Sequence, residues 1–146
     1  SKLGVTARRY CVDFYGTGTP SFLHKGIGTD RLWVHWMLDS PRVQQRIAGK
    51  RPSSLSSEAE AVPFLVALEN DAPGQSDLPR GAHPLRIEVP NNVSSLLHER
   101  PQLAREWRAA TRKAFMIAFD AGYLLGEFYR AVGPRPFGVY VLTLGT

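Results

Sequence analysis

The feature that most constrains the fold of this chain is a long amphipathic stretch between Pro101 and Ala121. Proline is favoured in the first turn of a helix, and glycine, here Gly122, commonly follows the last turn. The pattern therefore predicts one long helix. Its narrow apolar stripe is rich in alanine and consists of Leu103, Trp107, Ala110, Ala114 and Ala118. Because alanine is small, we expect this helix to lie close against a sheet, with Phe115 and Phe119 widening its apolar surface.

The opposite face of this helix is basic. It carries Arg105, Arg108 and Arg112, whose guanidinium groups suit carboxylates and phosphates. The stretch has neither a recognition-helix motif nor a high charge density, so we favour a solvated helix face over a nucleic-acid interface.

Two strands and a short helix are predicted in residues 1–49. Residues 8–15 are rich in strand-forming side chains and end at a Gly-Thr-Gly turn. Residues 31–38 alternate more clearly between two faces. Asp39-Ser40-Pro41 then forms a helix cap with proline at the first helical position, and the helix is expected to run to about Ala48.

A serine-rich stretch without apolar periodicity, residues 50–61, is typical of a linker. In residues 62–146, strand patterns over 64–69, 85–89, 123–130 and 138–144 surround the long helix in a ββαββ order. The whole pattern predicts an α+β fold with a mixed or antiparallel sheet and packed helices.

Composition narrows the class of protein. The chain has 146 residues, 43% apolar and 21% charged, which is typical of a globular domain. A single cysteine, Cys11, cannot form an internal disulfide, and we expect a cytoplasmic location. No apolar stretch approaches the roughly 20 residues that span a bilayer, so membrane insertion is not expected. The net charge of +5 favours anionic partners.

Motifs for a metal or a covalent catalyst do not stand out. Cys11 and the four histidines lack the paired spacing of metal ligands, so we expect no metal. Gly16-Thr17-Gly18 follows a strand, as phosphate-binding loops do, but position 21 is serine where the dinucleotide fingerprint needs a third glycine. A simple turn is the favoured interpretation, and the catalytic residues stay unassigned.

An acidic residue and an arginine stand at each end of the clearest strand. Asp30 precedes Arg31, and Asp39 stands three residues before Arg42. In one interpretation the acids cap and pair with the arginines. In the other, both arginines converge on an anionic substrate at the strand ends.

Three groups of short strings stand out together. The first comprises Lys2-Leu3-Gly4, Arg8-Arg9-Tyr10 and Phe14-Tyr15-Gly16. The second comprises Thr29-Asp30-Arg31-Leu32, His35-Trp36 and Leu38-Asp39-Ser40-Pro41-Arg42-Val43. The third comprises Ile87-Glu88-Val89-Pro90, Trp107-Arg108, Thr111-Arg112, Phe115 and Ala121-Gly122-Tyr123. They resemble the carboxy-terminal half of predicted GNAT-superfamily acyltransferases, of a subgroup often encoded near N-acylamino-acid racemases.

The resemblance implies a transferase that moves an acyl group from acyl-CoA to a small amine or amino acid. Residues 1–49 would be the end of a GNAT-like core. On the acceptor side, Arg31 or Arg42 would hold a carboxylate, and Trp36 and Tyr15 would form aromatic walls.

The sequence departs from the family at the coenzyme A site. GNAT enzymes bind the pyrophosphate through a Gln/Arg-x-x-Gly-x-Gly/Ala loop at a helix N-terminus. Residues 13–18 have the glycines but begin with aspartate, and residues 135–140 begin with arginine but end in tyrosine. Acyl-CoA is therefore a co-substrate by resemblance alone, and we expect a preceding GNAT half or a second subunit to supply the loop. The alternative is a non-catalytic GNAT-like module that binds a ligand, or forms a homodimer through a sheet edge and the Phe115/Phe119 surface.

Overall fold

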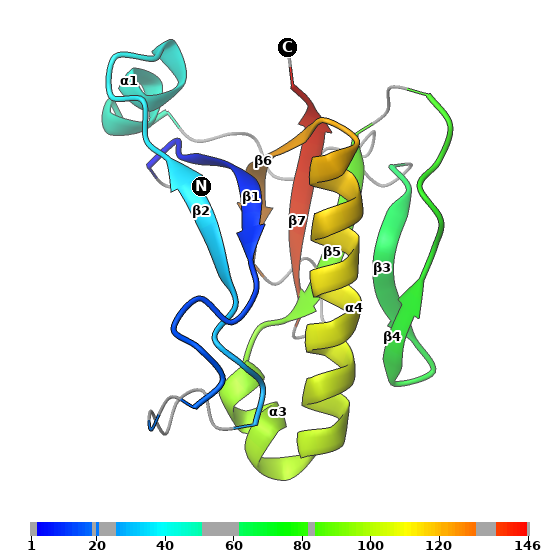
Figure 1. The fold of residues 1–146 in the computed structure, drawn as a ribbon. Coiled ribbons are helices and arrows are strands. Elements are labelled where there is room, and N and C mark those ends of the chain that lie inside the picture. The colour runs from blue at the N-terminus through cyan, green and yellow to red at the C-terminus, as the bar shows by residue number, and fades with distance from the viewer. Residues whose placement is uncertain are drawn as a thin grey trace.

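The computed structural model describes residues 3–18, 20, 26–50, 62–81, 84–130 and 137–145. These residues form an α+β fold around a seven-stranded mixed sheet (Figure 1), as the sequence predicts. The strands are β1 (Thr6–Cys11), β2 (Arg31–His35), β3 (Phe64–Glu69), β4 (Ala72–Gln75), β5 (Leu85–Pro90), β6 (Tyr123–Tyr129) and β7 (Phe137–Leu144). The helices are α1 (Pro41–Ile47), α3 (Val93–Glu99) and α4 (Pro101–Asp120).

The strand order is β2-β1-β6-β7-β5-β3-β4. Neighbouring strands are antiparallel except β3 and β5, which are parallel. Both β5 and β6 border β7, and the connection between them carries α3 and α4, with α4 lying across one face of the sheet (Figure 1). All four strands predicted in residues 62–146 are present, and the structure adds β4 and α3 to them. Of the predicted linker, residues 51–61 lie outside the described residues.

Helix α4 supplies much of the core. Pro101 stands in its first turn, and Gly122 follows it with a φ of 87°, as predicted. Its buried residues are Ala104, Trp107, Ala110, Thr111, Ala114, Phe115 and Ala118. Phe115 is 3% exposed and stacks on Tyr10 with ring centroids 5.6 Å apart. It therefore belongs to the core, whereas Phe119 beside it is half-buried.

The first two strands are shorter than predicted because turns interrupt them. β1 ends at Cys11, and Asp13 adopts a φ of 44°. The Phe14 N–H then donates to the Thr29 carbonyl at 3.1 Å. β2 ends at His35, ahead of a turn in which the Ser40 N–H bonds the Met37 carbonyl at 3.0 Å.

Strands β1 and β6 meet at a single pair, Ala7 and Leu125. Each is otherwise paired with its other neighbour, β1 with β2 and β6 with β7. Among the described residues no second pair joins β1 and β6, and we call the region where these two strands border each other the wedge. The wedge positions the candidate site described below.

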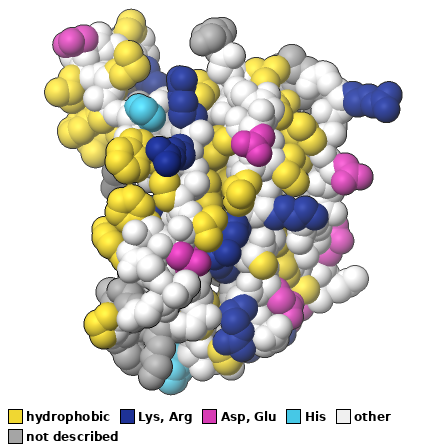
Figure 2. Space-filling model, viewed as in Figure 1, with side chains coloured by type: hydrophobic (Ala, Val, Ile, Leu, Met, Phe, Trp, Pro, Cys, Tyr) yellow, Lys and Arg dark blue, Asp and Glu magenta, His cyan; other side chains and the backbone are white. Residues whose placement is uncertain are grey.

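The edge strand β2 and the turn after it expose apolar side chains. Trp33, Val34, Trp36, Met37 and Leu38 are all exposed. Figure 2 shows hydrophobic side chains gathered along this side of the molecule, over β2 and α1. None of the helices in the described part of the chain has the length and apolar character needed to cross a bilayer.

Candidate functional site

A pocket of about 440 Å³ lies between α4 and the sheet, and residues of β1 and β6 contribute to its lining. Its polar lining includes Tyr10, Asp30, Arg31, Asn91, Arg108, Thr111 and Arg130. Its apolar lining includes Trp107, Phe115, Phe128 and Tyr140. The pocket therefore combines aromatic walls with guanidinium groups.

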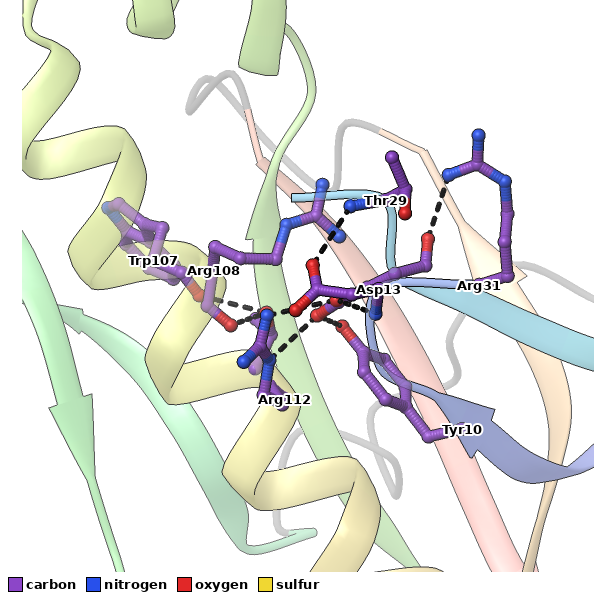
Figure 3. Close-up of polar contacts among 9 residues, drawn as sticks. Tyr10, Asp13, Thr29, Arg31, Trp107, Arg108 and Arg112 are labelled. Atoms are coloured by element: carbon purple, nitrogen blue, oxygen red, sulfur yellow. Dashed lines mark hydrogen bonds and ion pairs between the residues drawn. The ribbon is translucent and has the colours of Figure 1, made fainter. Parts of the chain in front are cut away.

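A hydrogen-bonded cluster around Asp30 forms part of the pocket wall. Figure 3 labels three of its members, Tyr10, Asp13 and Arg112. Asp30 is 5% exposed and accepts from three sides. The Tyr10 hydroxyl donates to it at 2.7 Å, and the Asp13 N–H at 3.0 Å. Arg112 on α4 donates from Nε at 2.8 Å and from Nη2 at 2.9 Å. The cluster thus ties β1, the start of β2 and α4 together.

These contacts set the ionisation of the cluster. Burial alone would raise the pKa of Asp30, but the hydrogen bonds from Arg112, Asp13 and Tyr10 hold it below its ordinary value. Burial and the hydrogen bond to Asp30 raise the pKa of the Tyr10 hydroxyl to about 12. At neutral pH, Asp30 is therefore charged and paired with Arg112, and Tyr10 is neutral.

The loop between β1 and β2 is held by side chains close to this cluster. Asp13 Oδ1 accepts from the Thr29 N–H at 3.3 Å. The Thr29 hydroxyl accepts from the Tyr15 N–H at 2.9 Å and donates to the Gly16 carbonyl at 3.2 Å. Thr29 is 1% exposed, so this local network fixes the residue that precedes Asp30.

Arg108 is the cation best placed to meet a ligand. Its guanidinium group lies beside the Tyr10 hydroxyl. Burial raises the pKa of Tyr10 and of Tyr140, and the positive charge of Arg108 partly opposes both rises. Within the described ranges, no acidic side chain forms an ion pair with Arg108. Asp30, the carboxylate of the pocket lining, is paired with Arg112 instead. Arg108 therefore brings positive charge into the pocket, and a ligand anion would balance it.

Aromatic rings form much of the apolar lining of the pocket. The Tyr140 ring lies 5.3 Å from the Phe115 ring and 4.6 Å from the Phe128 ring, measured between centroids. Trp107 packs on Phe137 with centroids 5.4 Å apart. Such rings hold one another in place by edge and offset contacts. They offer an apolar surface next to Arg108.

Of the four residues proposed from the sequence for acceptor binding, two lie together. Arg31 lines the pocket, its Nη1 donates to the Asp30 carbonyl at 2.8 Å, and its guanidinium carbon lies 5.1 Å from the centre of the Tyr15 ring. Tyr15 itself does not line the pocket.

The other two proposed residues lie on α1 or near it, away from this pocket. Trp36 donates from Nε1 to the Leu3 carbonyl at 3.1 Å. Arg42 donates to the Gly4 carbonyl at 3.0 Å, to the Gly126 carbonyl, and to Glu127 at 2.6 Å. Neither lines the pocket, so the structure does not bring Arg31 and Arg42 to one cavity.

Arg108, Tyr10 and Asp30 were not proposed as site residues from the sequence. Arg108 stands on a basic helix face, where a solvated side chain is the usual outcome. The three are separated by up to 98 positions along the chain and meet because α4 packs over β1. The sequence signal that could have found them is the presence of Tyr10, Asp30 and Arg108 in the strings of the family resemblance.

No family, no curated protein and no solved structure matches the chain. Across the described part of the chain, no group of three or more histidine, cysteine, aspartate or glutamate side chains could hold a metal ion.

Proposed function

We propose that this chain is the acceptor-binding part of a GNAT-like, acyl-CoA-dependent N-acyltransferase. The observation that carries the proposal is Arg108, which faces an aromatic-lined pocket without an acidic partner in the described structure. An acceptor with a carboxylate and an apolar side chain, such as an apolar amino acid, matches this pairing of charge and surface.

The segments that carry the family resemblance support the proposal by their position. Six of the quoted strings contribute residues to the pocket lining: Tyr10, Asp30, Arg31, Leu32, Val89, Pro90, Trp107, Arg108, Thr111 and Phe115. The four segments of the chain that contain them are distant in sequence, so their meeting at one pocket is a property of the fold. It is the pattern expected where a resemblance reflects a shared binding site.

In the proposed reaction, the amine nitrogen of the acceptor forms the amide bond to the acyl carbon. The carbon–sulfur bond to coenzyme A breaks, and the amine proton is returned to the leaving thiolate. This chain would hold the acceptor by its carboxylate, exclude water with its aromatic walls, and keep the Tyr10 hydroxyl neutral beside the anion. Because the pKa of Tyr10 is about 12, this phenol does not serve as a base at neutral pH.

A titration of single ligands tests the proposal. We expect L-phenylalanine to bind the chain, and phenethylamine, which lacks the carboxylate, to bind at least tenfold more weakly. Arg108→Gln should weaken L-phenylalanine binding by about 10- to 100-fold, the range of a charged hydrogen bond of about 1.5–3 kcal/mol. Arg105→Gln is the matched control, because Arg105 is exposed on the same helix and bonds Gln102. Equal binding of the two ligands, or an unchanged affinity in Arg108→Gln, contradicts the proposal.

A non-catalytic module that dimerises is the second candidate function. The exposed apolar side chains of β2 and the following turn, among them Trp33 and Trp36, favour it (Figure 2). An edge strand with an apolar surface is suited to pairing with another chain. Sedimentation of the wild type and of Trp33→Lys distinguishes this candidate, because a dimer formed at this edge would dissociate in the variant.

A further inference from the structure

A second cavity, of about 260 Å³, lies along the wedge between β1 and β6. It shares three lining residues with the pocket: Leu32, Phe128 and Tyr140. The two cavities are therefore neighbours with a common wall. We call the second cavity the wedge slot.

The wedge slot differs from the pocket in chemistry. Most of its lining side chains are apolar, and Ala7 and Leu125 mark the point where β1 and β6 meet. Its charged residue is Glu127, whose carboxylate is bound by Arg42 at 2.6 Å and by Arg46 at 2.7 Å. Arginine lines the pocket but not the slot. A ligand that occupies both cavities must therefore be anionic at one end and apolar at the other.

We propose that the wedge slot receives a linear aliphatic acyl chain while Arg108 holds the carboxylate of the acceptor. This inference rests on the proposed function and names the acyl group as a chain longer than acetyl. The space between two strands suits an unbranched chain better than a ring system, since both walls are strand side chains. The product with both parts in place is an N-acyl amino acid, with its carboxylate in the pocket and its tail in the slot.

Gly126 offers a way to fill the slot without disturbing the fold. It lines the slot, and a Cβ added there would meet only Arg42 Nη2, at 4.0 Å. Valine favours strand conformation, so Gly126→Val should fold and narrow the slot. Thr143→Val is the matched control, because Thr143 lies exposed on β7 and lines neither cavity.

The experiment is a calorimetric titration of the chain with N-acetyl-, N-butanoyl- and N-octanoyl-L-phenylalanine. In the wild type and in Thr143→Val we expect the affinity to rise by up to about fourfold per added methylene until the slot is filled. In Gly126→Val, which circular dichroism should show to be folded, we expect the octanoyl compound to bind no more tightly than the acetyl compound. Equal affinity of the wild type for all three compounds overturns the inference. So does an unchanged rise with chain length in folded Gly126→Val.

Arg108→Gln separates this inference from the proposed function. If the variant loses affinity equally for all three compounds, the anion site and the slot act independently, as expected. The opposite result is that Arg108→Gln binds all three compounds as tightly as the wild type does, with affinity still rising with chain length. That result contradicts the proposed anion site, and it also contradicts the inference, which has Arg108 hold the carboxylate while the slot holds the chain. If none of the compounds binds the wild type but L-phenylalanine does, the slot is overturned and the anion site stands.

Discussion

At the scale of single residues, Asp30 organises the candidate site. It is one carboxylate with donors from a tyrosine, a backbone N–H and an arginine on another element. Its pairing with Arg112 leaves Arg108, one turn away on the same helix, without an acidic partner among the described residues. The positive charge in the pocket therefore depends on which arginine, Arg108 or Arg112, pairs with Asp30.

Asp30→Asn should lower the free energy of unfolding by about 2–3 kcal/mol. The change removes a buried charge and leaves Arg112 without its carboxylate partner. The loss of stability should be smaller than for a fully buried ion pair, because the Arg112 side chain is 33% exposed. Urea denaturation measures the loss. Asp120→Asn is the control, since Asp120 is exposed on the same helix that carries Arg112. A loss no larger than that of the control would show that the cluster contributes little.

The same carboxylate should make stability depend on acid pH. The pKa of Asp30 is lowered in the folded state, so its contribution is present above the unfolded pKa of about 3.9 and is lost as pH falls through the folded pKa. The wild type should therefore approach the stability of Asp30→Asn as pH falls below about 4. Parallel pH profiles for the two proteins would contradict this assignment.

At the scale of elements, α1 is attached to the sheet through few contacts. Its one buried residue is Val43, against which Gly4 packs so closely that a Cβ on Gly4 would lie 3.0 Å from the Val43 Cα. Beside it, Arg42 and Arg46 both bond Glu127 on β6. Burial would raise the pKa of Glu127, but the cations around it, Arg46 and Arg42 among them, lower it. This carboxylate therefore clamps α1 to the strand that borders the wedge.

Glu127→Gln should loosen α1 without unfolding the sheet. The neutral amide cannot match two guanidinium groups, so the amides of residues 41–47 should exchange with deuterium about tenfold or more faster, which corresponds to roughly 1.4 kcal/mol or more of local stability. Amides of β5 and β7 should keep their protection. Glu106→Gln, an exposed change on α4, provides the control. Unchanged exchange in α1 would mean that Val43 packing alone holds it.

The elements show what sequence could predict. Local signals placed α4 within one residue of its end, because proline and glycine mark helix ends through their own backbone preferences. Local signals could not predict that the three arginines of α4 have different environments, because all three share one helix face: Arg105, Arg108 and Arg112. Their environments differ through distant partners: Arg112 meets Asp30, 82 positions away, whereas Arg105 bonds Gln102 within its own helix. The pairing of β1 with β6 is also long-range, so neither the wedge nor the pocket was predicted.

At the scale of the whole molecule, two neighbouring cavities lie where the pairing of the sheet is reduced to one residue pair. β1 and β6 pair only at Ala7 and Leu125. Both residues line the wedge slot, which shares a wall with the pocket. Helix α4 closes the pocket from one face and delivers Arg108 to it. In the proposed function, this chain holds the acceptor of an acyl transfer, and other residues hold the coenzyme.

The claim that this chain binds the acceptor but not the coenzyme is tested most directly by calorimetric titration. The purified chain is titrated with coenzyme A and, separately, with L-phenylalanine. The sequence contains no Gln/Arg-x-x-Gly-x-Gly/Ala loop. If the proposed function is right, we expect saturable binding of L-phenylalanine that Arg108→Gln weakens, and no saturable binding of coenzyme A. Tight, stoichiometric binding of coenzyme A by this chain, with no binding of L-phenylalanine, would contradict it.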